Sequence, residues 1–445
     1  MTGGTNLKTW VVMSVFLLGI GCTAAAGRTI FVDDDGPADF NNIQAAINDA
    51  NDGDTIIVAD GTYTGDGNRD IEFLGKAIVL RSENGPENCI IDCNGTEAEP
   101  HRGFFFRHGE DANSVLDGFT IRNGYDQVSG GGIVCSSVSP TICNCIITNN
   151  RAKDDGGGII CHTARPTIRD CIITKNRAEV WEGGGILFRA CKGATLDNCL
   201  ITENSAVYGG GIGSSGDNSP IYRDIIVTNC TFSANSAQYG GAVYVRDGSK
   251  PSIVNCILWG DTALYGPEIA LVGFWPEPFL YVSFSDVQGG EADVYDYGYL
   301  YWEPGNINSD PCFADPCNGD YHLKSQAGRW DANEGRWTMD EVTSPCIDAG
   351  NPGCPLGDEP NDPNNVRINM GAYGGTAEAG KSPPNWRGIA DITNDWIVDF
   401  NDLGVFVGYW LETGECILSD LNRNQSVDFA DFALIALHWL RDEHQ

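Results

Sequence analysis

Two twelve-residue stretches near the end of the chain carry oxygen-bearing side chains at the spacing that a calcium site uses. The first runs from Asp391 to Asp402, and the second begins 29 residues later at Asp420 and ends at Asp431. Calcium takes roughly six to eight oxygen ligands, and such a loop supplies side chains from positions 1, 3, 5, 9 and 12 and a backbone carbonyl from position 7. We therefore predict two calcium sites, with ligands Asp391, Thr393, Asp395, Ile397, Asp399 and Asp402 in one loop and Asp420, Asn422, Asn424, Ser426, Asp428 and Asp431 in the other.

Each loop runs into an apolar stretch that we predict as a helix ending in a Trp-Leu pair, at residues 410–411 and 439–440. Residues 388–445 hold 11 acids and 2 bases, and bound cations would offset this negative charge. The duplicated loop and helix resemble dockerins, which are modules that attach bacterial glycan-degrading enzymes to partners. The resemblance implies calcium binding and a cohesin-like or cell-surface protein partner. The alternative is a pair of acidic loops that bind no metal.

The loops depart from the dockerin pattern in two places. Position 6, where calcium loops have glycine for a sharp turn, is Trp396 in the first loop and Gln425 in the second. Positions 10 and 11 are often Ser or Thr in cohesin-binding dockerins, whereas here they are Phe400-Asn401 and Phe429-Ala430. These differences predict weaker calcium binding and a partner other than a standard cohesin.

The middle of the chain repeats a short motif, which predicts the scaffold. Asparagine and glycine recur together in NNRAKDDGGGI (149–159), KNRAEVWEGGGI (175–186), ENSAVYGGGI (203–212) and ANSAQYGGAV (234–243), with a degenerate copy at 260–269. A cysteine precedes each motif, and these cysteines are separated by 26, 28, 31 and 26 residues: Cys145, Cys171, Cys199, Cys230 and Cys256. A repeat of this length indicates a solenoid, in which each unit buries its apolar face against its neighbours.

The segments between the glycine clusters are too short for helices and are rich in β-branched residues, as in 145–148 and 227–232. Short strands joined by tight turns form a parallel β-helix, in which equivalent residues stack about 4.8 Å apart. The repeats resemble right-handed parallel β-helix proteins of the pectate-lyase-like superfamily over about residues 28–325. The resemblance implies either a polysaccharide lyase or hydrolase, or a non-catalytic, adhesin-like surface protein.

Stacking would align polar side chains in two columns that could do chemistry. The column before the glycines contains Asp155, Glu182, Tyr208 and Tyr239. Its two carboxylates, about 5 Å apart at the backbone, suit a glycosidase pair or a calcium site. A second column could neutralise a uronate and abstract its α-proton, and it contains Ser136, His162, Arg189, Ser215 and Arg246. Both columns also fit a solvated face, and seven residues separate them, so they need not share a groove. The catalytic residues therefore stay unknown.

Composition limits the partners. The 445 residues include 61 acids and 27 bases, a net charge of −34. This charge argues against nucleic acid and anionic membranes as partners. It also weighs against direct binding of a polyanionic glycan unless calcium or a local basic groove intervenes.

The first residues predict export. Lys8, the apolar run 10–20 and Ala24-Ala25-Ala26 are typical of a signal peptide covering residues 1–26. We expect a secreted or cell-surface protein, with a lipid anchor at Cys22 as the less favoured alternative. No other segment is apolar enough for a transmembrane helix.

The cysteines have two expected roles. The five-cysteine column suits buried free thiols, because inward-facing cysteine is a small apolar residue. Pairs close in sequence are candidate disulfides: Cys89/Cys93, Cys312/Cys317 and Cys346/Cys354.

The chain therefore divides into a signal peptide (1–26), an all-β solenoid with an N-terminal helical cap (28–325), a turn-rich exit segment (326–375), a linker (376–387) and a small all-α dockerin-like domain (388–445). The aromatic stretch 295–302 is either a lid on the core or a sugar-stacking platform. We expect a protein that binds extracellular polysaccharide and that, if it is an enzyme, is a polysaccharide lyase or a glycoside hydrolase.

Overall fold

The computed structural model describes residues 27–216, 223–273 and 276–440. The predicted signal peptide, with Cys22, lies outside these residues. Within them, no helix is both long enough and apolar enough to cross a bilayer.

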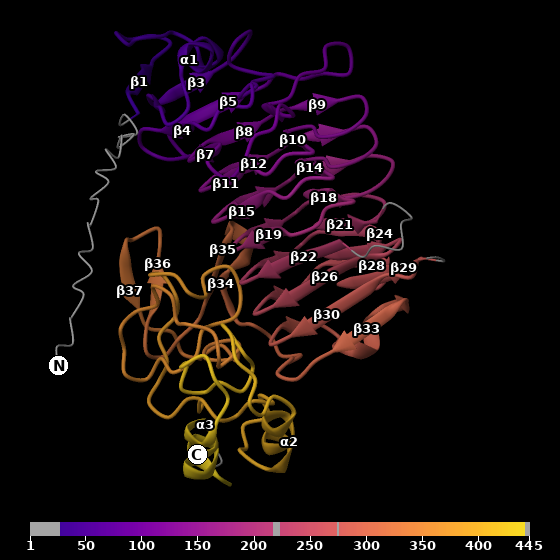
Figure 1. Ribbon diagram of the computed structural model, residues 1–445, viewed down its shortest axis with the longest axis vertical. Coiled ribbons are helices and arrows are strands. Elements are labelled where there is room, and N and C mark those ends of the chain that lie inside the picture. The colour runs from indigo at the N-terminus through magenta and orange to yellow at the C-terminus, as the bar shows by residue number, and fades with distance from the viewer. Residues whose placement is uncertain (1–26, 217–222, 274–275, 441–445) are drawn as a thin grey trace, which may run out of the picture.

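The predicted parallel β-helix is confirmed, and three parallel sheets form its walls (Figure 1). The first sheet contains β1 (Thr29–Val32), β2 (Thr55–Val58), β4 (Val79–Ser82), β7 (Val115–Asp117), β11 (Thr141–Cys143), β15 (Thr167–Arg169), β19 (Ala194–Asp197), β22 (Arg223–Thr228), β26 (Ser249–Val254), β30 (Phe279–Ser283) and β33 (Tyr299–Trp302). The second contains β3 (Gly61–Tyr63), β5 (Cys89–Asp92), β8 (Thr120–Arg122), β12 (Ile146–Thr148), β16 (Ile172–Thr174), β20 (Leu200–Thr202), β23 (Thr231–Ser233), β27 (Ile257–Leu258) and β31 (Asp286–Val287).

The third sheet carries the groove described below. Its strands are β6 (Phe104–Phe106), β10 (Ile133–Ser136), β14 (Ile159–His162), β18 (Ile186–Arg189), β21 (Ile212–Ser215), β25 (Val243–Arg246), β29 (Ile269–Val272) and β32 (Tyr295–Tyr297). Short strands pair in the turns that precede it, namely β9 (Tyr125–Asp126), β13 (Arg151–Ala152), β17 (Arg177–Ala178), β24 (Ser236–Tyr239) and β28 (Thr262–Tyr265).

The cysteine column stacks inside the solenoid as predicted. Its five members are buried among the isoleucines, valines and phenylalanines of the core. The backbone N–H of Cys199 donates to Sγ of Cys230, whose own N–H donates to Sγ of Cys256, both at 3.4 Å. Every cysteine that the structure describes is a free thiol, so the predicted Cys89/Cys93, Cys312/Cys317 and Cys346/Cys354 bridges are not formed.

A second buried column runs through the asparagines of the repeat. Oδ1 of Asn204 accepts from both the N–H (3.0 Å) and the side-chain amide (3.1 Å) of Asn176 in the preceding coil. Asn150 bonds to Asn176 in the same way, Asn204 to Asn235, and Asn235 to Asp261. The side-chain amides also satisfy strand carbonyls, so this asparagine ladder joins each coil to the next.

Both ends of the solenoid are covered. At the N-terminal end, α1 (Ile43–Asp49) buries Ile43, Ala46 and Ile47 over the first coil, at the top of Figure 1. At the other end the last coil consists of β32 and β33, where Leu300 and Trp302 pack against the core. Residues 295–302 are therefore a lid, although Tyr297, Tyr299 and Tyr301 remain exposed.

The coils end at Trp302, before the predicted boundary at residue 325. The helical turn η1 (Glu291–Asp293) lies just before β32, and beyond Trp302 come the helical turn η2 (Pro316–Asn318) and two antiparallel hairpins. The hairpins are β34 (Phe313–Asp315) with β35 (Asp320–Leu323), and β36 (Arg329–Asp331) with β37 (Arg336–Thr338). Figure 1 shows this part of the chain folded back beside the C-terminal half of the solenoid.

The predicted helices of the last domain are α2 (Phe400–Gly408) and α3 (Phe429–His438). Residues 376–387, predicted as a linker, are packed: Ser382 is buried and donates to Asp348 at 2.5 Å, and Arg387 is 4% exposed. A second apolar core joins solenoid residues such as Phe284 to Ile347 of the exit segment and Phe406 of α2. The C-terminal domain is therefore seated on the rest of the molecule.

Candidate functional site

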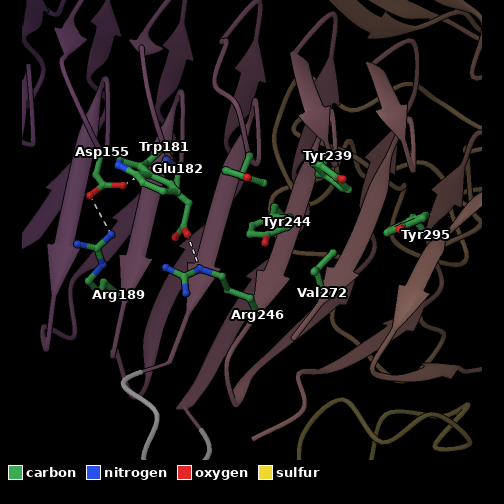
Figure 2. Close-up of a pocket in the computed structure, with 10 residues that line it drawn as sticks. Asp155, Trp181, Glu182, Arg189, Tyr239, Tyr244, Arg246, Val272 and Tyr295 are labelled. Atoms are coloured by element: carbon green, nitrogen blue, oxygen red, sulfur yellow. Dashed lines mark hydrogen bonds and ion pairs between the residues drawn. The ribbon is translucent and has the colours of Figure 1, made fainter. Parts of the chain in front are cut away.

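A groove of about 650 Å³ lies on the outer face of the third sheet, between its strands and the turns that enter them (Figure 2). Residues from both predicted columns line it, together with aromatic residues of later coils: Asp155, Trp181, Glu182, Arg189, Tyr208, Tyr239, Tyr244, Arg246, Val272 and Tyr295.

The glycine run between the two columns brings them together. Gly156 adopts a left-handed conformation (φ 61°), and a Cβ on Gly157 would lie 2.4 Å from the backbone of Arg177 in the next coil. Only glycine allows this tight return of the chain. As a result, the carboxylates that precede the glycines lie opposite the ends of the strands of the third sheet.

Ion pairs connect the columns. Arg189 Nη2 donates to Asp155 Oδ2 at 2.8 Å, and Arg246 Nε donates to Glu182 Oε1. Arg246 also pairs with Asp247. The residues of the second column do stand in register, from Ser136 through His162 to Arg246. However, the predicted strip offers no unpaired positive charge, because carboxylates neutralise both of its arginines. Ser136 and His162 do not line the groove.

Glu182 is the most unusual ionisable group in the groove. It is 2% exposed, and its Oε2 is buried without a hydrogen-bond partner among the described residues. Burial raises the pKa of Glu182, and the nearby Arg246 only partly opposes this shift. A carboxyl group that holds its proton more tightly than usual can act as a general acid.

The two carboxylates lie on adjacent coils. The backbone N–H of Glu182 donates to Asp155 Oδ1 at 3.2 Å. The sequence left a solvated face as the alternative for this column, whereas Asp155 is only 6% exposed. The site therefore combines a carboxylate ion-paired to Arg189 with a buried carboxyl group one coil further on.

An aromatic ladder extends from these acids along the solenoid. Its rings Trp181, Tyr208, Tyr239 and Tyr265 stack on successive coils, with centroids 6.2, 5.5 and 4.7 Å apart. Tyr244 packs 5.1 Å from Tyr208, and Tyr295 packs 5.1 Å from Tyr265. Sequence reasoning found Tyr208 and Tyr239 but missed Trp181 and Tyr265 as members, although each precedes a glycine of its own repeat.

The first predicted calcium loop brings acidic oxygens together. Ligand atoms of Asp391, Asp395 and Asp402 lie within 4.8 Å of one another, and Asp391 and Asp402 are fully buried. Asp402 accepts from the backbone and the hydroxyl of Thr393, at 2.9 and 3.1 Å. Asp399 caps α2 by accepting from the N–H of Asn401, and Ile397 is exposed.

The second loop repeats this geometry. Asp420 accepts from the N–H groups of Asn424 and Gln425, as Asp391 does from those of Asp395 and Trp396. The N–H of Asn422 donates to Asp431 at 3.0 Å, Asp428 caps α3, and Ser426 occupies position 7. The position-6 residues Trp396 and Gln425 have φ of 73° and 69°, so these side chains occupy the left-handed turn that glycine usually makes.

The two loop–helix units pack against each other through reciprocal contacts. Trp410, after α2, meets Phe429 of the second unit, while Trp439, after α3, meets Phe400 of the first, each at 5.0 Å. The N–H of Leu440 donates to Val398 in one loop, and that of Leu411 donates to Val427 in the other. Within this approximate twofold arrangement, the carboxylates at positions 1 and 12 of each loop are buried. Carboxylate oxygens are the ligands that a hard divalent cation prefers.

Comparisons with known proteins agree with the solenoid. Residues 143–266 match the family described as "Right handed beta helix region". Residues 289–350 match a second family, described as "Disaggregatase related". Neither match reaches the predicted calcium loops, and no curated protein matches the chain.

Three solved structures are similar in part. Pectate lyase Pel9A has 16% identity and a TM-score of 0.37, with 78% of this chain and 96% of that chain covered. Pectin methylesterase from carrot has 12% and 0.34, with coverages of 64% and 90%. Alginate lyase from Paenibacillus sp. str. FPU-7 has 11% and 0.23, with coverages of 63% and 99%.

Proposed function

We propose that the groove on the third sheet binds a polysaccharide and hydrolyses its glycosidic bonds. The observation that carries the proposal is the buried Glu182, with its raised pKa and unpartnered Oε2, one coil from the Asp155 carboxylate. Glycosidases use two carboxyl groups of this kind, one protonated and one charged. The open groove continues along the coils, which suits a chain-like substrate.

In this proposal Glu182 donates its proton to the glycosidic oxygen as the bond to the leaving sugar breaks. Asp155 then acts on the opposite side of the sugar ring, as a nucleophile or as a base that activates water. Arg189 holds the Asp155 carboxylate in place through its 2.8 Å ion pair. The phenols and the indole of the aromatic ladder offer apolar edges and hydroxyl groups to further sugar units.

Hydrolysis fits this geometry better than elimination. A lyase needs a cationic group available to neutralise a uronate carboxylate, whereas Arg189 is paired with Asp155, and Arg246 with Glu182 and Asp247. With Glu182 protonated, the carboxylates of Asp155 and Asp247 still balance these two arginines, so the groove carries no net positive charge that would attract a polyanion. We therefore favour a substrate that is neutral or weakly charged.

The test uses Glu182→Gln, which keeps the shape of the side chain but removes its acid. We expect release of reducing ends from a panel of plant and bacterial polysaccharides to fall at least about 100-fold, because general acid catalysis contributes roughly that much. Glycan binding, measured by affinity electrophoresis, should persist. Ser136→Ala, on the same sheet outside the groove, is the control. Unchanged turnover in Glu182→Gln would reject the catalytic assignment.

A non-catalytic, adhesin-like function is the second candidate. Glu182 is buried and ion-paired with Arg246, whose side chain is 32% exposed, and a purely structural pair would show the same arrangement. Glycan binding without release of reducing ends or of ultraviolet-absorbing unsaturated products would establish this second function.

For the C-terminal domain we propose calcium binding and tethering of a secreted or surface-located protein to a cohesin-like or other cell-surface partner. Buried carboxylates at positions 1 and 12 of both loops support it, because buried charges are costly. Asp391 is already paired with Arg387 at 3.4 Å, and a cation would offset the charge that remains. When bound, calcium would neutralise these groups and fix the loops; Asp391, Asp395 and Asp402 would hold one ion, and Asp420, Asn422, Asn424 and Asp431 the other.

Calorimetry of the whole chain tests the ion sites. We expect calcium to release or absorb heat with a stoichiometry near two, and Asp391→Ala with Asp420→Ala to abolish the signal. Asp66→Asn, a fully exposed acid far from both loops, is the control and should change nothing. The absence of calcium-dependent heat in the unaltered protein would contradict the proposal.

A further inference from the structure

Two cysteines from distant parts of the chain meet where the exit segment touches the dockerin-like domain. Cys354 belongs to the exit segment, and Cys416 belongs to the stretch that connects α2 to the second predicted calcium loop. The two thiols influence each other, since the Cys416 thiol raises the pKa of Cys354 and the Cys354 thiol lowers that of Cys416. Both line one surface pocket of about 470 Å³, with Cys354 partly exposed and Cys416 exposed.

Contacts on both sides hold these cysteines in place. The side-chain amide of Asn351 donates to the carbonyl oxygen of Cys416 at 3.1 Å, and a Cβ on Gly353 would lie 1.9 Å from the carbonyl oxygen of Ile417. Arg423 of the second loop donates to the carbonyls of Pro352 (3.0 Å) and Val366 (2.5 Å). The backbones that carry the thiols are thus already docked, so joining the thiols requires little further ordering.

The Cys354/Cys416 pair differs from the cysteines of the stacked column in its exposure to solvent. The neighbouring Cys354 thiol lowers the pKa of Cys416, and the positive charge of Arg423 acts in the same direction. The thiolate form is the one that attacks a disulfide. By contrast, the cysteines of the stacked column are buried in the apolar core, where no oxidant reaches them. Cys346, expected to pair with Cys354, instead donates to Asp286 at 3.1 Å inside the protein.

We propose that Cys354 and Cys416 form a reversible disulfide that locks the dockerin-like domain onto the exit segment. The oxidant is a small disulfide such as oxidised glutathione. The Cys416 thiolate attacks one of its sulfurs, forming a mixed disulfide and releasing one small thiolate. Cys354 loses its proton to solvent and attacks the Cys416 sulfur, which releases the second small thiolate. One small disulfide is thereby reduced to two thiols while two protein thiols become one disulfide.

The lock has a specific consequence for the ion-binding loops. It connects the exit segment to the peptide between the two loops, so the domain remains seated even when no cation holds the loops in shape. This inference concerns the seam alone and does not depend on the function of the groove or on calcium binding.

Peptide mapping of the whole chain tests the proposal. The protein is incubated with oxidised glutathione, its remaining thiols are alkylated, and it is digested without reductant. We expect a cross-linked peptide pair containing Cys354 and Cys416, lighter by two hydrogens than the sum of the two reduced peptides. Cys416→Ser should abolish this pair, whereas Cys317→Ser, the control at another exposed cysteine, should leave it intact.

Two results would overturn the inference. One is glutathione that stays on Cys416 while Cys354 is alkylated, and the other is a dominant Cys312–Cys317 cross-link. The locking role has its own measurement, which needs no variant. With a chelator present, oxidation should slow protease cleavage within residues 411–419 at least about tenfold, because cleavage follows local opening. An unchanged cleavage rate would show that the disulfide does not lock the domain.

Discussion

Single side chains decide how the asparagine ladder ends. Four of its members are asparagines, but the fifth is Asp261, which is buried beside Glu268. Asp261 Oδ1 accepts the same two bonds from Asn235 that each asparagine accepts from the coil before it. Asp261 Oδ2 and Glu268 Oε2 have no hydrogen-bond partner among the described residues, and the two carboxyl groups act on each other. Burial is the main reason that the pKa of each is raised, so the pair retains a proton that exposed acids would lose.

Asp261→Asn should therefore stabilise the protein at neutral pH. A carboxyl group whose pKa is higher in the folded state stabilises the fold at low pH, and this contribution disappears as the pH rises through the raised pKa. Asparagine keeps the accepting oxygen and presents an amide to Glu268. We expect the variant to gain about 1–3 kcal/mol in the free energy of unfolding at pH 7–8, since one pKa unit is worth about 1.4 kcal/mol.

Urea unfolding between pH 4 and pH 8 measures this effect. The gain should shrink toward pH 4, where the carboxyl group is protonated in the folded protein and about half protonated in the unfolded chain. Asp66→Asn changes a fully exposed acid and should leave the pH dependence unaltered. Parallel pH profiles for Asp261→Asn and the unaltered protein would contradict the expectation.

The columns of stacked residues could be predicted from the sequence because the spacing of the repeats gives the length of each coil. Cys145 and Cys171 must stack if the backbone passes the same point every 26 residues. The ion pairs could not be predicted in this way. Glu182 and Arg246 are 64 residues apart, and they meet only because a long side chain reaches across one intervening coil. No residue pattern encodes that reach, so the sequence placed the two columns correctly but not in one groove.

At the level of turns, the second glycine of each motif determines how closely the coils approach. A methyl group on Gly157 would lie 2.4–2.6 Å from three backbone atoms of Arg177, and backbone in a packed coil cannot move aside. We expect Gly157→Ala to lower the free energy of unfolding by more than about 2 kcal/mol. Because Asp155 lies two residues away, the variant should also weaken glycan binding in the groove.

Thermal unfolding and affinity electrophoresis provide the two readouts. The matched control is Gly404→Ala in α2, where a Cβ would meet nothing within 4 Å. Alanine favours a helix over glycine by roughly 0.5–1 kcal/mol, so this change should be neutral or stabilising. Equal effects of the two substitutions would show that the close approach at Gly157 carries no cost.

Secondary-structure elements followed the sequence most closely where local pattern and burial agree. The N-terminal helical cap that the sequence predicts is α1. The hairpin of β36 and β37 was not predicted, since its pairing joins Trp330 to Trp337 within a segment that reads only as turns. The packing of residues 376–387 was also missed, because glycine and proline are equally common in free linkers and in tightly packed turns.

For the molecule as a whole, the second core makes the C-terminal domain a structural part of the exit segment. Arg367 is completely buried and donates to the carbonyl oxygen of Asp391 at 2.6 Å, and Asn394 donates to those of Gly305 and Ala349. Ending the chain at residue 387 would expose Ile347, remove one acceptor of Arg367 and leave the carbonyl oxygens of Gly305 and Ala349 without the Asn394 donor. Such a loss of buried apolar and hydrogen-bonded contacts is strongly destabilising.

We therefore expect a chain ending at residue 387 to retain the solenoid but to lose the exit segment. Hydrogen exchange should show rapid labelling of residues 340–375, while β10 to β25 stay protected. A chain ending at residue 440 is the control and should match the full-length protein. Continued protection of residues 340–375 in the shorter chain would mean that the domain is an independent appendage.

The asparagine ladder also sets which changes of length the protein can tolerate. Asn150 and Asn176 bond to the next rung in the same way, so duplicating the 26-residue circuit that starts at Asn150 would leave the ladder bonds of the new junction satisfied. Inserting a circuit between Glu182 and Arg246 would instead carry the arginine beyond its reach. Natural variation in the number of rungs should therefore accumulate before Glu182 and spare the stretch from Glu182 to Arg246.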